Sequence, residues 1–286
     1  MATVLKEKKN QIYKGSRGIY DKRNKINNLT GKEWLKLSKS VWISTKSAID
    51  KDAFEHPAPF LVEDIKKLIL LFTKKNDYVL DPFMGSGTTL LAAVLTDRFG
   101  IGIDLNKEYV KLSKKRLKKI ESDSKKFKII HGDSIMEIKK LDLIDYCVTS
   151  PPYHNILKNK GMGIRHDGSQ RRQGIEYYSD DNEDVGNKET YLAYLDSVKN
   201  IMQEVFRKLK NKKYCTIIIS DFTVEKKETN AHGDMIKLIQ EIGFESAGTT
   251  ILVQDSKPLY PFGYPYAYKI NHVHQYLLNF RKVVIS

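Results

Sequence analysis

The sequence is poor in cysteine, with only Cys147 and Cys215 among 286 residues. Both lie inside short apolar runs, and neither has metal-ligating residues at the spacing of a zinc site. The sequence therefore predicts neither a disulfide framework nor a metal site. No apolar stretch approaches the roughly 20 residues needed to span a bilayer, and residues 1–10 are charged rather than signal-like. These absences predict a soluble, cytoplasmic protein with no membrane partner.

Acidic residues are also in short supply, because 49 Lys and Arg stand against 35 Asp and Glu. The resulting formal charge of +14 favours a polyanionic partner such as nucleic acid, although a lysine-rich composition can equally reflect the base composition of a genome. With 41% hydrophobic residues, the chain can bury a full core as one large domain with appendages or as two small domains.

The chain divides into a basic N-terminal arm, residues 1–31, and a domain at 32–286. The arm shows no sustained period and is predicted to be extended or partly disordered. Residues 31–44 predict a short helix and a strand, and residues 61–72 have apolar positions at helical spacing. From residue 78 onward, short apolar strands alternate with helices. The predicted strands are 78–80, 100–103, 128–130, 144–148, 214–220, 247–254 and 274–281, and the helices between them are 90–95, 107–120, 135–139, 188–208 and 234–242.

This alternation predicts an α/β fold: a doubly wound, mostly parallel, Rossmann-like sheet with helices on both faces. In such a sheet, ligands bind beyond the carboxyl ends of the strands. Two loops follow predicted strands. Residues 81–89, Asp-Pro-Phe-Met-Gly-Ser-Gly-Thr-Thr, let the backbone pass close to a ligand at a helix N-terminus. Residues 149–153, Thr-Ser-Pro-Pro-Tyr, are stiff and leave carbonyl oxygens free to accept hydrogen bonds beside an aromatic ring, which suits a flat base with an amino group.

These two loops resemble the cofactor-binding and catalytic motifs of the DNA amino-methyltransferases that use S-adenosyl-L-methionine (AdoMet). The catalytic motif of that family is (Ser/Asn/Asp)-Pro-Pro-(Tyr/Phe), and the resemblance spans roughly residues 30–283. It implies that Asp81 holds the methionine amino group, that Asp104 accepts from the ribose hydroxyls and that Asp133 accepts from the adenine amino group. Helix capping is the competing role for these acids. The full set of cofactor residues implied is His56, Pro57, Asp81, Pro82, Phe83, Gly85, Ser86, Gly87, Thr88, Asp104, Leu105, Asp133 and Ser134.

The resemblance implies that Ser150, Pro151, Pro152 and Tyr153 form the catalytic loop, with no metal. Ser150 and the Pro151 carbonyl would accept protons of the target amino group, and Tyr153 would stack on the base after it is flipped out of duplex DNA. Direct transfer needs no covalent intermediate. Carbon-5 cytosine methylation, by contrast, uses a Pro-Cys nucleophile, and neither cysteine here has that context.

In this family, Ser at the first motif position is associated with cytosine N4 and Asp with adenine N6. The sequence therefore predicts N4-cytosine methylation of duplex DNA, most simply in a prokaryotic restriction-modification system with a separate cognate endonuclease. N6-adenine methylation, methylation of an RNA amino group, and a non-catalytic nucleic-acid-binding protein stay open as alternatives. A nicotinamide dehydrogenase is disfavoured because Gly85-Ser86-Gly87 lacks the third glycine of that fingerprint.

Many family members of this glycine-loop type place the catalytic motif first, whereas here the cofactor loop comes first. The target-recognition element therefore cannot be located by position. The candidates are segment 154–187, which carries Arg165, Arg171 and Arg172, and the Tyr/Pro-rich segment 257–270. The arginines can read guanine edges or neutralise phosphates. The aromatics of the second segment alternate as a packed strand would, so core packing competes with base stacking.

Overall fold

The computed structural model describes residues 9–56, 59–120, 124–154, 184–224, 227–255, 257 and 259–284. Within these residues, a central eight-stranded sheet has the order β3-β11-β12-β8-β7-β4-β5-β6. Its strands are β3 (Val41–Ile43), β4 (Tyr78–Asp81), β5 (Phe99–Asp104), β6 (Phe127–His131), β7 (Ile144–Thr149), β8 (Leu209–Ile219), β11 (Phe244–Val253) and β12 (His274–Lys282). No helix in the described part of the chain is long and apolar enough to cross a bilayer.

Every neighbouring pair in this sheet is parallel except the two pairs that contain β12. From β4 the chain moves outward to β5 and β6, then returns to β7 on the other side of β4. The point where the strand order reverses therefore lies between β4 and β7, which is where ligands bind in doubly wound sheets. The predicted doubly wound, mostly parallel fold class is confirmed.

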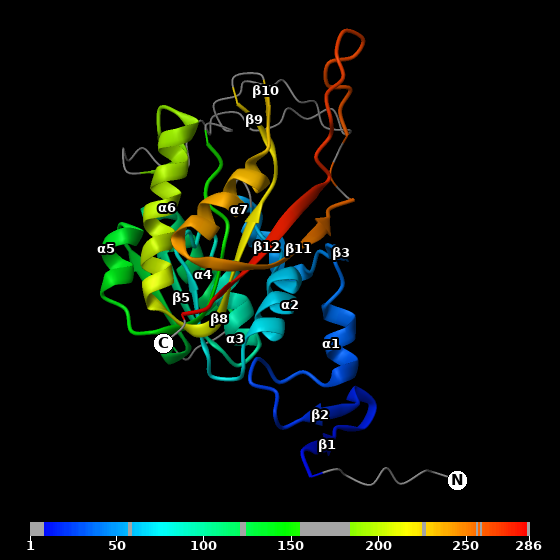
Figure 1. Ribbon diagram of the computed structural model, residues 1–286. Helices are drawn as coiled ribbons and strands as arrows, with labels where there is room; N and C mark the ends of the chain where they lie inside the picture. Colours follow the sequence, from blue (N-terminus) through cyan, green and yellow to red (C-terminus); the bar gives the residue numbers. More distant parts are fainter. Residues whose placement is uncertain are drawn as a thin grey trace.

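Helices cover both faces of the sheet (Figure 1). They are α1 (Gly31–Leu37), α2 (Val62–Phe72), α3 (Thr88–Leu95), α4 (Lys107–Lys118), α5 (Ser134–Lys139), α6 (Tyr191–Lys208) and α7 (Ala231–Ile242). Apolar side chains of α2, α3 and α4 form one buried cluster with the sheet, and those of α5, α6 and α7 form another. Strands covered on both faces are mainly apolar, and all six residues of β7 are buried. Cys147 of β7 and Cys215 of β8 are register partners and are both buried.

The structure differs from the expected extended arm between residues 9 and 30. Strands β1 (Gln11–Tyr13) and β2 (Ile19–Asp21) pair as an antiparallel hairpin. The segment that follows is anchored to the body, because the buried Asn27 side chain donates to the Leu71 carbonyl at 2.6 Å. Thr30 and Glu33 then form a capping box that begins α1. Hydrogen bonds of asparagine side chains, rather than apolar packing at a regular spacing, order this segment. The hydrophobic pattern of the sequence therefore gives no indication that the segment is ordered.

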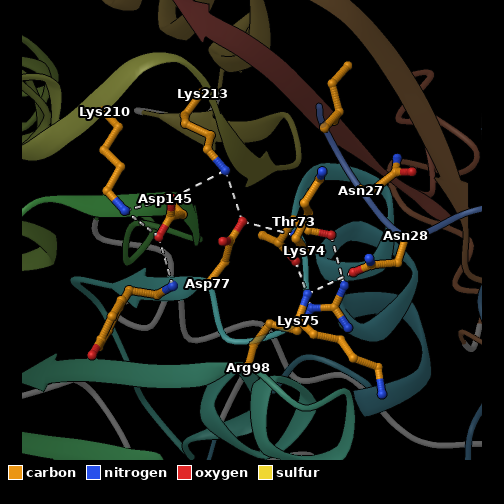
Figure 2. Close-up of polar contacts among 12 residues, drawn as sticks. Asn27, Asn28, Thr73, Lys74, Lys75, Asp77, Arg98, Asp145, Lys210 and Lys213 are labelled. Carbon is orange, nitrogen blue, oxygen red and sulfur yellow. Dashed lines mark hydrogen bonds and ion pairs between the residues drawn. The ribbon is translucent and has the colours of Figure 1, made fainter. Parts of the chain in front are cut away.

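A polar network joins the amino-terminal ends of the central strands, opposite the proposed ligand edge (Figure 2). The buried Asp145 carboxylate of β7 accepts from the Tyr78 backbone N–H at 3.1 Å and from the Lys210 ammonium at 2.9 Å. Lys213 bridges the Asp145 and Asp77 carboxylates. Burial alone would raise the pKa of Asp145, but the Lys210 hydrogen bond, the Tyr78 N–H and the nearby lysine charges hold it below its ordinary value.

Replacing Asp145 by asparagine is expected to lower the free energy of unfolding by about 2 kcal/mol at pH 7, because charge-assisted hydrogen bonds are lost. Because the pKa of Asp145 is depressed in the folded state, its ionised carboxylate stabilises the fold above the unfolded-state pKa of about 3.9. This stabilisation is lost as the pH falls through the folded-state pKa. The deficit should therefore disappear in strongly acidic solution. Denaturant titrations at several pH values measure it, with the exposed Asp196→Asn as the control. A deficit that persists unchanged at low pH would contradict the electrostatic explanation.

Candidate functional site

The carboxyl ends of β4, β5, β6 and β7 surround one pocket, to which α4, α6 and flanking loops also contribute. It is lined by His56, Pro59, Phe60, Pro82, Phe83, Met84, Gly85, Ser86, Thr88, Asp104, Leu105, Asn106, Tyr109, Asp133, Ser134, Ser150, Pro151, Pro152, Tyr153, Asp184, Val185 and Ile201. Residues of both predicted loops are on this wall, although their motifs are about 60 residues apart in sequence. The topology therefore brings together the two motifs on which the sequence prediction depends.

The glycine loop, residues 82–87, needs its glycines for geometric reasons. Gly85 and Gly87 have φ values of +51° and +77°, in the left-handed region that other residues avoid. A Cβ on Gly87 would also lie 2.8 Å from the Ser113 hydroxyl. Gly87 is the N-cap of α3, so the loop passes directly into a helix whose first amide groups carry partial positive charge.

Side chains of helix α4 form hydrogen bonds with the glycine loop and hold it in place. The sequence did not predict this support. The Ser113 hydroxyl donates to the Gly85 carbonyl at 2.8 Å. The buried Arg116 guanidinium donates to the Ser86 carbonyl at 2.6 Å and to the Thr88 hydroxyl at 2.9 Å. Sequence showed α4 only as a strongly basic helix. The sequence signal that could have identified these two residues is the spacing of apolar residues in α4, which places Ser113 and Arg116 on the apolar face of the helix.

Asp81 connects the two loops. It is 1% exposed, and its carboxylate accepts from the hydroxyls of Thr89 and Thr149, both at 2.6 Å, and from the Phe83 N–H at 3.1 Å. Burial raises its pKa above the ordinary value. Asp81 does not line the pocket. In this arrangement it fixes the glycine loop after β4 to the end of β7, and its contact with a methionine amino group stays a prediction from the sequence.

Asp104 is at the end of β5 and lines the pocket. One carboxylate oxygen accepts from the Gly85 N–H at 2.7 Å and the other from the Asn106 N–H at 2.8 Å. Burial, with smaller contributions from the Asp81 and Asp184 carboxylates, raises the pKa of Asp104 to about 7. Asp133 and Asp184 also line the pocket, so carboxylates surround a cavity in a chain of strongly positive net charge. A cationic ligand suits this cavity.

Asp133 combines the two roles that sequence left open, since it lines the pocket and also caps α5 by accepting from the Ile135 N–H at 2.7 Å. Ser134 donates to the Pro82 carbonyl at 2.5 Å and so ties α5 to the glycine loop. His56 packs edge-on against Tyr109, with ring centroids 4.4 Å apart. A Cβ on Gly85 would lie 3.1 Å from the His56 ring, so the pocket wall is closed at this point.

The loop after β7 places Ser150, Pro151, Pro152 and Tyr153 on the pocket wall. Ser150 is partly exposed, whereas Pro151 is buried. Tyr153 is 9% exposed and packs edge-on against Phe222, with centroids 5.5 Å apart. Its hydroxyl accepts a hydrogen bond from the Gln275 amide of β12 at 3.2 Å. Tyr153 is thus held on two sides, and its ring orientation is fixed before any ligand arrives.

The structure brings most of the predicted site residues to the pocket. Gly87 and Asp81 are not among the residues that line it. Pro57, Arg165, Arg171 and Arg172 lie outside the described residues, as does most of segment 154–187. Sequence reasoning missed several lining residues that come from loops and helices without a motif: Pro59, Asn106, Tyr109, Asp184, Val185 and Ile201. Within the described ranges, no group of three or more His, Cys, Asp or Glu side chains could hold a metal ion.

A family model described as DNA methylase, the N6/N4 type, matches residues 3–115 and 144–283. Type II methyltransferase M2.DpnII of Streptococcus pneumoniae is 39% identical over 116 residues, which are 40% of this chain and 41% of that protein. Type II methyltransferase M2.LlaDCHI of Lactococcus lactis subsp. cremoris is 47% identical over 85 residues, or 29% of this chain and 32% of that protein.

The orphan methyltransferase M.BamHII of Bacillus amyloliquefaciens is 47% identical over 73 residues, which are 26% of this chain and 28% of that protein. The matched segments thus span less than half the length of these curated relatives. Among solved structures, TrmN from Thermus thermophilus superposes with a TM-score of 0.51 at 13% identity, covering 82% of this chain and 52% of that one. At this identity, the likeness concerns the fold alone.

Proposed function

Because the chain belongs to the N6/N4 family of DNA methylases, we propose that it transfers a methyl group from AdoMet to an exocyclic amino group in DNA. The observation that carries the proposal is the shared pocket: the glycine loop and the Ser150–Tyr153 loop line one cavity and are joined through the Thr149–Asp81 hydrogen bond of 2.6 Å. One carboxylate therefore sets the distance between a cofactor-type loop and an amine-binding loop.

The residues of the pocket fit AdoMet. Carboxylates of Asp104, Asp133 and Asp184 suit a ligand that carries a sulfonium and an ammonium charge. The remaining acceptor capacity of Asp104 suits ribose hydroxyls, and Asp133 suits the adenine amino group. Aromatic and apolar side chains such as Phe60, Phe83 and Leu105 offer packing surface for a flat ring. AdoMet, when bound, supplies the electrophilic methyl group.

The loop after β7 orients the substrate amine. The Ser150 hydroxyl and the Pro151 carbonyl accept hydrogen bonds from the two amino protons, which directs the nitrogen lone pair into the cavity. Consecutive prolines remove two backbone donors and fix φ, so this geometry needs little reorganisation. Tyr153 offers its ring to a base that has left the duplex stack, and flipping costs a few kcal/mol. No step requires a covalent bond between the protein and the base.

The finer proposal is that the base is cytosine, methylated at N4. Its support is Ser150 at the first position of the motif, because serine there is associated with cytosine in this family. Adenine N6 is the alternative within the same mechanism.

The biological setting that we propose is protection of DNA in a restriction-modification system, in which a separate endonuclease cuts the unmethylated sequence. The support is the type II designation of M2.DpnII and M2.LlaDCHI. M.BamHII is designated an orphan methyltransferase, which supports a solitary methylase as the alternative. Arg165, Arg171 and Arg172 are proposed DNA contacts of segment 154–187.

The proposal is tested by incubating the protein with AdoMet and duplex DNA of mixed sequence, then identifying the digested nucleosides by mass spectrometry. N4-methylcytosine is the expected product. N6-methyladenine would retain the mechanism and overturn the choice of base. No methylated nucleoside from DNA, with methylation of a parallel RNA sample, would overturn the substrate class.

The pKa of Asp104 predicts that AdoMet affinity rises with pH between 6 and 8. Ribose hydroxyls donate best to the ionised carboxylate, and a pKa of about 7 leaves roughly a tenth of Asp104 ionised one unit lower. The dissociation constant should therefore be about ten-fold larger at pH 6 than at pH 8. Calorimetric titration measures it.

The matched control is Asp104→Asn, which keeps the shape of the side chain and should bind weakly with no step near pH 7. The sign for folding is opposite: a raised pKa stabilises the free protein at low pH, and this stabilisation is lost as the pH rises through about 7. If the variant retained the wild-type pH dependence, another group would be responsible.

A further inference from the structure

The connection between β11 and β12 extends beyond the sheet edge as an irregular hairpin, drawn in orange-red (Figure 1). We define the aromatic finger as residues 259–272. Its Tyr264, Tyr266 and Tyr268 side chains are 81%, 94% and 90% exposed, and Leu259, Phe262 and Ile270 are exposed as well. The alternation of aromatics in the sequence fitted a packed strand as well as a stacking surface. Exposure of this extent excludes core packing for the three tyrosines.

Hydrogen bonds within the finger fix its shape. The Asn271 side chain accepts from the Tyr260 N–H at 2.9 Å and donates to the Tyr260 carbonyl at 2.8 Å, which clamps its two sides together. At the tip, the amides of Tyr266 and Ala267 both donate to the Gly263 carbonyl at 2.7 Å. These bonds order the backbone that carries the tyrosines before it meets a partner, so little backbone entropy is lost on binding.

The finger stands at the same edge of the sheet as the proposed catalytic loop. Strand β11 runs parallel to β7 through the order β11-β12-β8-β7, so the finger after Val253 and the loop after Thr149 emerge on one side. The strand that follows the finger contacts this loop, because Gln275 of β12 donates to the Tyr153 hydroxyl. Gln275 also accepts from the Gln254 amide at 3.0 Å, so the sheet residues on either side of the connection are linked near Tyr153.

The chemistry of the finger identifies its partner. Residues 259–272 contain no Asp or Glu, one lysine and one histidine, and the whole chain carries +14. Rigid exposed rings offer stacking to planar groups, and the absence of carboxylates avoids repulsion from a polyanion. An exposed apolar cluster of this kind marks an interaction site. DNA, whose bases become available for stacking when the duplex opens, matches both properties.

We propose that the aromatic finger binds substrate DNA by stacking Tyr264, Tyr266 and Tyr268 on bases next to the opened base pair. This inference rests on the proposed action on DNA. The affinity of the finger for DNA then comes from ring stacking rather than from phosphate neutralisation. The hydrogen bond from Gln275 to the Tyr153 hydroxyl then couples DNA binding by the finger to the position of Tyr153.

The test compares the protein carrying Tyr264→Ser, Tyr266→Ser and Tyr268→Ser together with the wild type. Fluorescence anisotropy with a labelled duplex of mixed sequence gives the affinity at several salt concentrations. Stacking is worth about 1–3 kcal/mol per base, which corresponds to roughly five-fold or more for each ring. Three such rings together correspond to about 100-fold, so the triple variant should lose affinity by about that factor while its salt slope and AdoMet affinity stay at wild-type values, because tyrosine carries no charge.

Two control variants sharpen the test. Tyr13→Ser changes another exposed tyrosine, on β1 at the opposite end of the molecule (Figure 1), and this variant should bind DNA as the wild type does. Lys269→Gln removes the one lysine of the finger and should lower the salt slope by about 1 if that charge meets a phosphate. A triple variant that binds DNA within two-fold of the wild type would overturn the proposal.

The finger could instead bind a second copy of this chain. Sedimentation without DNA separates the cases: a wild-type assembly that dissociates in the triple variant, with DNA affinity unchanged, would overturn the proposal in favour of self-association. The nucleoside assay on the same preparations tests the proposed function independently. If the wild type yields no methylated nucleoside but the triple variant still loses DNA affinity, the finger stands and the proposed chemistry fails.

Discussion

Methyl transfer is expected to fall by at least about 100-fold when Ser150 is replaced by alanine, while AdoMet affinity stays within two-fold of the wild type. Ser150 lines the pocket at the end of β7; under the proposed function, its hydroxyl accepts from the substrate amine and takes no part in holding the glycine loop. Loss of this acceptor leaves the amine held by the Pro151 carbonyl alone, and misplacing a reacting group by about 1 Å costs about 100-fold in rate. Single-turnover transfer of a radiolabelled methyl group measures the chemical step.

A matched control is Ser197→Ala, since the Ser197 hydroxyl donates only to the Ala193 carbonyl of its own helix, α6. That variant should transfer at the wild-type rate. Ser150→Asp asks a second question, because aspartate at the first motif position is the residue associated with adenine N6; its product should be tested for N6-methyladenine. If Ser150→Ala transferred the methyl group at the wild-type rate, Ser150 would have no catalytic role.

Replacing Asp81 by alanine is expected to abolish both AdoMet binding and methyl transfer. The change removes the acceptor for the Thr89 and Thr149 hydroxyls and the Phe83 N–H. Each buried polar group left without a partner costs about 1–3 kcal/mol, so the free energy of unfolding should also fall by at least about 2 kcal/mol. AdoMet titration and denaturant unfolding are the two measurements.

Asp81→Asn separates the shape of this connection from its charge. Asparagine keeps one acceptor oxygen in the same place, so it should retain more AdoMet affinity than alanine does. The exposed Asp142, which precedes β7, supplies the control Asp142→Ala, with no expected loss. If Asp81→Ala bound AdoMet normally, the position of the glycine loop would not depend on the Asp81 carboxylate.

The centre of the sheet was predictable because strands such as β4 and β7 are buried on both faces. Short, mainly apolar runs such as 144–148, each followed by a polar residue at the ligand edge, are a strong signal for parallel strands. The N-terminal hairpin had no such signal. Its order comes from Asn27 and from the Thr30–Glu33 capping box, and interactions of single polar side chains with a distant backbone leave no period in the sequence.

The candidate site divides in the same way. Ser150, Asp104 and the glycine loop were identified because a motif or a strand end marks them. Arg116 was missed because, among the lysines of α4, its charge looks like another part of a basic, solvated surface until the helix is packed. Asp81 was identified as well, and its contact with a methionine amino group stays a prediction. The sequence could not show that Thr149, from a strand that the fold brings alongside, donates to its carboxylate.

The antiparallel pairing of β11 and β12 has an evolutionary consequence. The two strands bring the ends of their connection together, and the Gln254 N–H donates to the Val273 carbonyl at 2.6 Å just beyond the ladder. Changing the length of a connection closed in this way costs little free energy. A lineage can therefore exchange this short stretch of gene for another, by recombination or by insertion, while the sheet and pocket are inherited unchanged. Under the proposed role of the finger, new sequence preferences then arise without rebuilding the catalytic centre.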